Sequence, residues 1–422
     1  MADASTVQPS NTKQNARIIM REFDRRRFLA GAAGAGSMAA FWPRALLAQG
    51  TQPIKIGILI PLTGSTSQFG ATMSAAAKIA VSNINAAGGV AGRLVEVLIE
   101  DDQSNPEAAV RAVRKLIDVD KVVSIGGSYA SAVTSAIAPL CYESKTVLFT
   151  SSGADSITKT PHNGYVFRTS PTVTLQGTRV GQYALELGAK KMFFLGPQTP
   201  FAQSYIDIIS KLFKDAGGFG QGLIYEDKRA SYRTEVDQAL RTNPDVVVLG
   251  GYVPDTSVVL KDLYRAGFGG KKIGYSFGVN QVLADGLPHE VSEGTASLVP
   301  SASEDSTAYK TLIGKMGRSA LDSYSCQVYD HVVLTTLALA QAAAASPNGT
   351  VVRDAVRAIS QDPKGEKVSD VAQGLKLIAD KKPLNYDGPS GPLEFAANGD
   401  VEGVFFRYEQ VQKGKMALLK VA

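Results

Sequence analysis

The stretch Ile54-Lys-Ile-Gly-Ile-Leu-Ile60, which is followed by Pro61, begins a regular alternation of strands and helices. A short run rich in β-branched residues and bounded by proline is typical of a buried strand. Residues 71–86 then have a helical pattern that ends at Gly88 and Gly89, as helices commonly do. A buried strand followed directly by a helix is the repeating unit of a parallel α/β sheet.

Outward from this stretch, the alternation fills two successive parts of the chain. In the first part we predict further strands at 94–100, 122–125 and 147–150, with helices at 106–118 and 132–144. After Pro171 we predict strands at 192–195, 222–225, 246–249 and 272–276, with helices at 174–187, 202–216, 233–241 and 256–266. Two such series predict an α/β protein of two lobes, each with a parallel sheet covered on both faces.

The last third of the chain departs from this rhythm. Helical patterns occupy 307–316, 326–345, 351–360 and 368–379. We then predict a β segment at 391–395, a turn at 398–400 and two closing strands at 403–410 and 416–421,.

Composition and charge exclude several classes of protein. The 422 residues are 44% hydrophobic and 20% charged, which rules out a disordered chain and a polytopic membrane protein. The formal net charge is +5, but residues 1–48 alone carry seven Lys or Arg and three acids. The remaining 37 basic and 36 acidic residues nearly balance, which argues against a nucleic-acid-binding protein.

The first 48 residues have the features of an export signal. Arg25-Arg26-Arg27-Phe28-Leu29 precedes a weakly apolar stretch at 30–42, and this pattern resembles a twin-arginine signal. At about 1.5 Å per residue the stretch is too short to cross roughly 30 Å of hydrocarbon. We therefore predict a signal and N-terminal extension over 1–48, export to the periplasm and cleavage after residue 48, with the start at Met1 or Met20 left open. An amphipathic helix that anchors the chain to a membrane is the alternative.

Nothing in the sequence points to an enzyme. His162, His289 and His331 are scattered, which favours neither a metal cluster nor a Ser-His-Asp triad. No nucleophile elbow or nucleotide-binding glycine motif is present, so we expect no catalysis, no cofactor and no metal. Cys141 and Cys326 either pair or stay reduced, and we favour two buried free thiols.

Several motifs, taken in this order, resemble one family. They are Ile56-Gly-Ile-Leu-Ile-Pro-Leu-Thr-Gly64 with Gly70, Ile84-Asn85-Ala-Ala-Gly-Gly-Val-Ala-Gly-Arg93, Asp101-Asp102 with Pro106, Ile125-Gly-Gly127 with Ser131, and Gly391-Pro392. Over residues 53–412 the chain resembles the branched-chain amino-acid (Leu/Ile/Val-binding) type of periplasmic solute-binding protein, the receptor of an ABC importer.

This resemblance implies a type I periplasmic binding protein fold, in which two Rossmann-like lobes joined by three crossings close on a ligand by hinge motion. It places lobe one at 51–171 plus 300–388 and lobe two at 172–299 plus 389–422. The implied partners are a small-molecule ligand and the ABC permease and ATPase subunits at the inner membrane. We expect a monomer that binds no nucleic acid.

The resemblance also implies a ligand site at the ends of the strands. Tyr129 and Ser131 follow the third strand, where the family holds the ligand's carboxylate. The loop after the next strand, with Ser152, Gly153 and Asp155, is expected to complete this cradle through backbone N–H groups. Aromatic residues of the family's ligand walls correspond to Phe69, Phe201, Tyr252 and Tyr329.

Two positions depart from the amino-acid-binding members of the family. Where these place a Glu that holds the ligand's ammonium, this chain has Phe277, and a second expected acid is Val173. A buried ammonium without a carboxylate is strongly disfavoured. We therefore expect an amine-free aromatic or aliphatic acid as the ligand, or else an amino acid whose ammonium is held by Asp155 or by cation–π contacts.

Two other functions stay open. A ligand-sensing receptor without a transport role would share the fold, although an export signal argues against a cytoplasmic regulator. An exported hydrolase is the weaker alternative, because the sequence contains no recognisable nucleophile motif.

Overall fold

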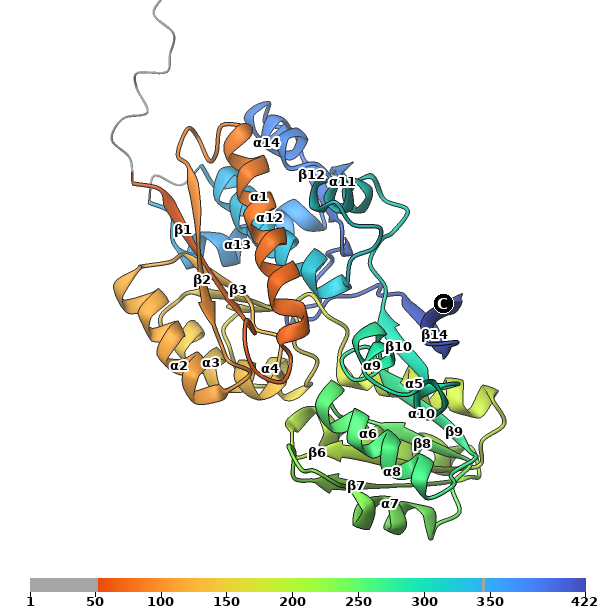
Figure 1. Cartoon of the computed structure of the whole chain (residues 1–422). Helices are drawn as coiled ribbons and strands as arrows, with labels where there is room; N and C mark the ends of the chain where they lie inside the picture. The colour runs from red at the N-terminus through yellow and green to blue at the C-terminus, as the bar shows by residue number, and fades with distance from the viewer. Residues whose placement is uncertain (1–51, 344–345) are drawn as a thin grey trace, which may run out of the picture. The chain divides into compact units, whose positions relative to one another are not determined.

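Two main sheets organise the part of the chain that the computed structural model describes, residues 52–343 and 346–422 (Figure 1). The predicted export signal and its cleavage site lie outside the described residues. Within the described part, every helix is too short or too polar to cross a membrane.

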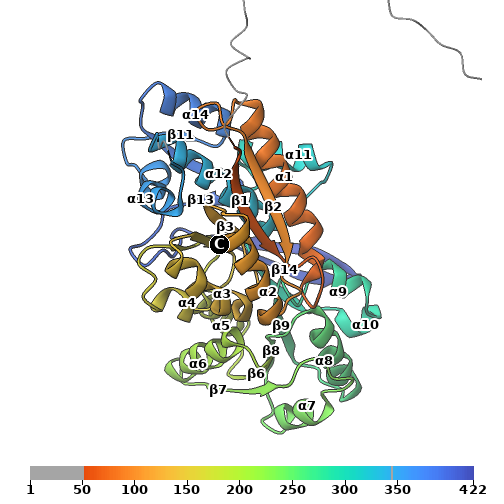
Figure 2. The ribbon, with the colours of Figure 1, turned by 90° about the vertical axis from the view of Figure 1, so that its left-hand side faces the viewer.

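The first sheet has five parallel strands in the order β2-β1-β3-β4-β5. They are β1 (Ile54–Ile60), β2 (Val95–Asp101), β3 (Ser124–Gly127), β4 (Val147–Thr150) and β5 (Val166–Arg168). Successive strand residues face opposite sides of a sheet. Ile58 therefore packs in a core with α1 (Gly70–Ala86) and α12 (Ser323–Gln341), whereas Leu59 packs in a second core with α2 (Pro106–Arg114) and α3 (Ser131–Glu143). The two views in Figures 1 and 2 show these helices around β1 and β3.

The second sheet has seven strands in the order β15-β14-β10-β9-β8-β6-β7. They are β6 (Lys191–Pro197), β7 (Phe219–Tyr225), β8 (Val246–Leu249), β9 (Lys271–Tyr275), β10 (Ala296–Pro300), β14 (Phe406–Gln412) and β15 (Lys415–Val421). The strands β6 to β10 are parallel, and β14 and β15 add an antiparallel edge.

Helices again cover both faces of this second sheet. Phe194 lies in one core with α5 (Val173–Glu186) and α6 (Pro200–Asp215). Its neighbour Phe193 lies in another core with α7 (Arg233–Leu240) and α8 (Val253–Arg265). The short helices α9 (Gln281–Asp285) and α10 (His289–Ser292) follow β9.

The chain passes between the two sheets three times. It leaves β5 for α5 through 169–172, returns from β10 to α11 (Thr307–Met316) through 301–306, and leaves again through 393–405 to β14. Between the last two crossings, α12, α13 (Gly349–Ser360) and α14 (Val371–Ala379) pack beside the first sheet with a small sheet of β11 (Glu366–Val368), β12 (Leu384–Gly388) and β13 (Gly391–Pro392). The lobe boundaries stay a prediction, since Thr51–Ala422 forms one compact unit.

The sequence pattern misjudged several elements near the crossings. The strands β5, β10 and β12 were not predicted; of these, β10 is completed by β14, a partner from a distant part of the chain. The helix predicted at 106–118 ends at Arg114, where a π-helical turn, η3 (Lys115–Val119), continues it. The helix predicted at 326–345 spans Ser323–Gln341 instead and is capped by the side chain of Asp322. The helix predicted at 368–379 begins at Val371, because the residues before it pair as β11.

The two cysteines are buried and unpaired, one in α3 and one in α12. Burial raises the pKa of the Cys141 thiol to about 12, so this thiol is protonated and unreactive. The prediction of two buried free thiols is confirmed.

Candidate functional site

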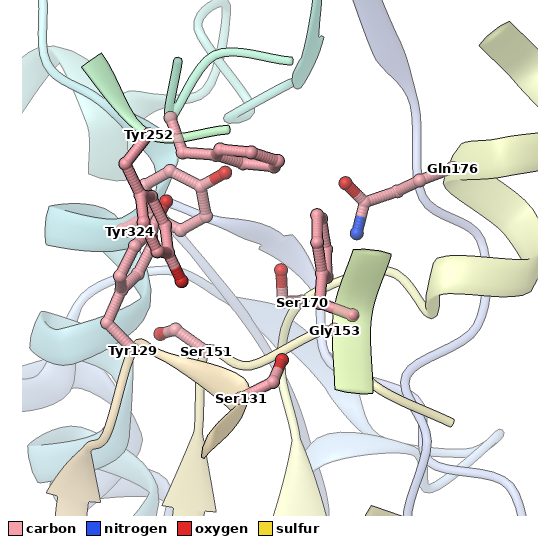
Figure 3. Close-up of a pocket in the computed structure, with 10 residues that line it drawn as sticks. Tyr129, Ser131, Ser151, Gly153, Ser170, Gln176, Tyr252 and Tyr324 are labelled. Carbon is pink, nitrogen blue, oxygen red and sulfur yellow. The ribbon is translucent and has the colours of Figure 1, made fainter. Parts of the chain in front are cut away.

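A cavity lies where the carboxyl ends of strands from both sheets meet (Figure 3). Its lining residues come from the loops after β3, β4, β5, β8 and β9 and from the first turns of α3, α5, α6 and α12: Tyr129, Ser131, Ser151, Gly153, Ser170, Gln176, Phe201, Tyr252, Phe277 and Tyr324. Parallel sheets commonly bind ligands at this end of the strands. The empty space among these residues, about 310 Å³, includes open solvent.

The polar end of the cavity is built on the N-terminus of α3. Ser131 is the first residue of this helix, and its N-cap, Ala130, provides no side-chain hydrogen bond. The first N–H groups of a helix have no partner within it and carry partial positive charge. Ser131 Oγ accepts a hydrogen bond from the Ala154 N–H (3.2 Å), so its own hydrogen is available for another group. This end of the cavity is therefore suited to an anion.

A second hydroxyl strengthens this preference. The Ser151 hydroxyl is buried and has no hydrogen-bond partner among the described residues. It lines the same cavity as Ser131 and points toward the tyrosines in Figure 3. A buried polar group without a partner costs free energy, and a ligand oxygen would relieve that cost.

Buried hydroxyl groups bind the loop that carries Ser151 to the turn before α3. Ser152 Oγ lies 2.8 Å from the carbonyl oxygens of both Ser128 and Tyr129 and also contacts the Thr134 hydroxyl. The Thr150 hydroxyl donates to the Ser128 carbonyl (2.8 Å). These buried bonds fix the loop against the turn before α3, so the two halves of the polar end keep one relative position.

Aromatic rings form most of the rest of the cavity wall, with Ser170 and Gln176 beside them. Phe201 and Phe277 meet edge to face with ring centroids 4.8 Å apart, and Tyr252 packs on Phe277 at 5.5 Å. On the other wall, Tyr129 and Tyr324 meet edge to face at 4.7 Å. Edge-to-face contacts at these distances stabilise ring clusters, so the cavity presents flat apolar surfaces beside its polar end.

Every ionisable group in the cavity wall is a tyrosine. Burial raises the pKa of Tyr129 well above its ordinary value, and it also raises the pKa values of Tyr252 and Tyr324. These hydroxyls therefore stay protonated and neutral. Since no lining residue in the described part of the chain is acidic or basic, a ligand would be recognised by neutral hydrogen-bonding groups and rings alone.

The structure brings together six of the ten predicted site residues: Tyr129, Ser131, Gly153, Phe201, Tyr252 and Phe277. The other four lie outside the lining. The Phe69 ring packs against Tyr129 and Tyr324, with ring centroids 5.0 and 5.1 Å away. The Ser152 side chain contacts the turn before α3 instead of the cavity.

Asp155 and Tyr329 have other partners. The Asp155 carboxylate accepts a hydrogen bond from the Thr174 hydroxyl (2.5 Å), and the Tyr329 hydroxyl accepts one from Asn83 Nδ2 (2.9 Å). Val173 is buried in the hydrophobic core. Neither Asp155 nor Val173 lines the cavity, so neither is placed to hold a ligand's ammonium there.

Sequence reasoning missed four lining residues: Ser151, Ser170, Gln176 and Tyr324. Ser151 had a signal, because it precedes Ser152 in the loop expected to form the cradle. Ser170 follows β5, which was not predicted. Gln176 and Tyr324 lie on helices whose orientation depends on the crossings, and no pattern local to either helix reveals which side faces the cavity.

Known proteins resemble this chain over most of its length. A sequence model of the family described as "Periplasmic binding protein" matches residues 53–405. The leucine-, isoleucine-, valine-, threonine- and alanine-binding protein of Pseudomonas aeruginosa is 26% identical over 359 residues, which cover 84% of this chain and 88% of that protein.

Solved structures share the fold. A leucine binding protein from Thermotoga maritima, 21% identical, matches with a TM-score of 0.74 over 87% of this chain and 98% of that one. A solute binding protein of an ABC transporter from R. palustris, solved in complex with benzoate, is 19% identical and has a TM-score of 0.71 over 88% of this chain and 96% of that one. The chain therefore has the type I fold and belongs to the periplasmic binding protein family, as a member of its branched-chain amino-acid type.

Proposed function

We propose that this protein is the periplasmic solute receptor of an ABC importer and that its ligand is a small carboxylic acid without an amine, such as benzoate. One observation carries the proposal: a cavity with an uncapped helix N-terminus and two serine hydroxyls at one end is walled elsewhere mainly by aromatic rings, with Ser170 and Gln176 beside them, and no acidic side chain of the described residues lines it.

The polar end suits a carboxylate rather than a phosphate or a cation. No lysine or arginine lines the cavity in the described part of the chain, so a doubly charged anion would lack a counter-charge. A single carboxylate can be satisfied by neutral donors, since charge-assisted hydrogen bonds from N–H and O–H groups are strong. A cation would meet donors of the wrong polarity.

The aromatic end suits a ring or a branched apolar group and disfavours an ammonium. Phe277 stands where amino-acid-binding relatives are expected to carry a Glu, and Asp155 is engaged by Thr174. Leaving a buried charge unpaired costs several kcal/mol. The benzoate complex of the R. palustris protein supports the view that this fold accommodates such an acid.

Binding and closure are coupled in this account. A ligand that touches Ser131 on the first sheet's side and Phe201 or Phe277 on the second sheet's side stabilises the closed arrangement by its joint contacts. The closed form is then what the permease recognises. Export by the twin-arginine route, a monomeric state and the absence of catalysis belong to the same proposal.

A thermal-shift screen tests the ligand class. The panel holds benzoate, 4-hydroxybenzoate, aliphatic acids, leucine, valine and phenylalanine. A ligand at 100 times its Kd adds roughly 2.7 kcal/mol to the free energy of unfolding, a shift of a few degrees. We expect stabilisation by amine-free acids alone. Stabilisation by amino acids alone would refute the proposed ligand and favour a cation–π site for the ammonium.

A further inference from the structure

Arg168, the last residue of β5, is entirely buried and lies outside the cavity lining. Its Nε donates to Asp400 Oδ1 (2.7 Å) and its Nη2 to the Thr158 hydroxyl (2.5 Å). Its Nη1 donates to two backbone carbonyls of the cavity loop, those of Ser152 (3.3 Å) and Ala154 (2.9 Å). The guanidinium therefore binds the cavity loop on the side that does not line the cavity.

The geometry of the peptide bond transmits this hold to the cavity. In a trans peptide the N–H of one residue points opposite to the carbonyl of the residue before it. Because Arg168 holds the Ser152 carbonyl, the Gly153 N–H in the same peptide points away from the guanidinium. Gly153 itself lines the cavity.

The neighbouring peptides of the loop are committed elsewhere. The Gly153 carbonyl accepts a hydrogen bond from the Val173 N–H (2.7 Å), and the Ala154 N–H donates to Ser131 Oγ (3.2 Å). In the part of the chain that the structure describes, the Gly153 N–H has no acceptor, and Arg168 is the one donor to the Ser152 carbonyl. Of the N–H groups of residues 151–154, only that of Gly153 lacks an acceptor among the described residues and is left for a ligand, and one side chain sets its direction.

Asp400 supplies the counter-charge that makes a fully buried guanidinium tolerable. Its carboxylate is 19% exposed and lies on the third crossing. The backbone joins the same pair of segments, since the Arg168 N–H donates to the Gly399 carbonyl and the Val401 N–H donates to the Arg168 carbonyl. Removing the Asp400 charge would therefore weaken the anchor of Arg168 while leaving its bonds to the cavity loop in place.

We propose that Arg168 is a positioning residue for carboxylate binding, which holds the Ser152 and Ala154 carbonyls so that the Gly153 N–H is aimed at the ligand's carboxylate. The inference rests on the proposed function, because a carboxylate ligand is what requires this donor. The residue acts through Gly153 and does not touch the ligand.

The test uses the full chain and benzoate as the probe. Arg168→Lys keeps the charge but loses the planar set of donors. Arg357→Lys is the matched control, because Arg357 donates to the Ala396 and Ala397 carbonyls but not to the cavity loop. Asp400→Asn is the second variant, which separates stability from positioning. Calorimetry measures the affinity of each, and the Gly153 amide resonance, identified with Gly153→Ala, is followed in glycine-labelled protein.

We expect benzoate to shift the Gly153 amide proton downfield in the wild type, in Arg357→Lys and in Asp400→Asn. In Arg168→Lys we expect this shift to be lost and the affinity to fall roughly 10- to 100-fold. An unchanged shift and an affinity within twofold of the wild type in Arg168→Lys would overturn the inference. The inference would also be overturned if Arg168→Lys and Asp400→Asn lost affinity in the same proportion to their loss of thermal stability. If the wild type does not bind benzoate or any other carboxylate, the proposed function fails, and the inference fails with it.

Discussion

Ser131 shows how a neutral side chain can bind an anion. Its position at the start of α3 combines a hydroxyl with the unpaired N–H groups of the first helical turn,. Its bond from Ala154 fixes the oxygen, so the hydroxyl hydrogen has a preferred direction before any ligand arrives. Pre-organisation of this kind lowers the entropy cost of binding.

Replacing Ser131 with Ala is therefore expected to weaken carboxylate binding by about 1–3 kcal/mol, the usual contribution of a hydrogen bond to a charged group. Calorimetric titration with benzoate measures the change. Ser135→Ala is the matched control, since Ser135 lies one turn later on the exposed side of α3. Equal affinities for the two variants would remove Ser131 from the site.

At the scale of elements, direct hydrogen bonds join the two sides of the cavity. Gln68 in η2 (Ser67–Phe69) donates from Nε2 to the Phe277 carbonyl in the loop after β9 (3.1 Å). The Tyr324 hydroxyl lies 3.1 Å from the Ser276 hydroxyl in the same loop. These bonds join the two sides of the cavity without using the ligand, so under the proposed closure mechanism they stabilise the closed form,.

Gln68→Ala is expected to lower affinity by about 0.5–1.5 kcal/mol, mainly through faster dissociation, although Gln68 does not line the cavity. Surface plasmon resonance or stopped-flow fluorescence gives the rate. Ser67→Ala serves as the control on the same turn. A dissociation rate equal to that of the wild type would show that this bond does not hold the closed form.

Elements with local determinants were predictable, and those completed at a distance were not. The strand at 54–60 was predicted to the residue, because a β-branched run ending at Pro61 specifies it locally. Ala296–Pro300 was missed, because its antiparallel partner, Phe406–Gln412, follows about a hundred residues later,.

The same distinction applies to the candidate site. Tyr129 and Ser131 could be predicted because they follow a strand end, where α/β sheets bind ligands. Gln176 and Tyr324 could not be predicted, because the three crossings, and not the local sequence, determine which face of their helices lines the cavity.

At the scale of the whole molecule, α12 contacts the first crossing and the β12–β13 segment through buried polar side chains. Asp330 accepts hydrogen bonds from the Ser390 N–H (3.0 Å) and the Tyr386 hydroxyl (2.7 Å). Next to it, His331 Nε2 lies 2.7 Å from the Thr169 hydroxyl, and His331 Nδ1 accepts from the Gly127 N–H (3.0 Å). The helix thus links the first crossing and the β12–β13 segment to β3, the strand that ends beside the cavity.

Burial raises the pKa of Asp330 to about 7, and the nearby Asp387 carboxylate also raises it. The hydrogen bonds from Ser390 and Tyr386 lower this pKa but do not offset the effect of burial. The native state then binds a proton between about pH 4 and 7 that the unfolded state has lost, so this group lowers the free energy of unfolding as the pH rises through that window. His331, whose pKa is lowered by burial to about 3, acts in the opposite direction.

Asp330→Asn removes the pH dependence of stability that Asp330 causes and keeps the one that His331 causes. We expect the stability difference between the variant and the wild type to move in favour of the variant as the pH rises from 4 to 7. Urea unfolding at pH 4, 5.5 and 7 provides the comparison. Parallel pH profiles for the two proteins would mean that Asp330 is already ionised in the native state.

The central claim, a carboxylate site that rejects an ammonium, is tested most directly by calorimetry with matched pairs of ligands. 3-Phenylpropionate and phenylalanine differ in the α-ammonium, as do 4-methylpentanoate and leucine. The account predicts that the amine-free acid of at least one pair binds and that its amino acid binds roughly 100-fold or more weakly. Tighter binding of the amino acid in both pairs would contradict it.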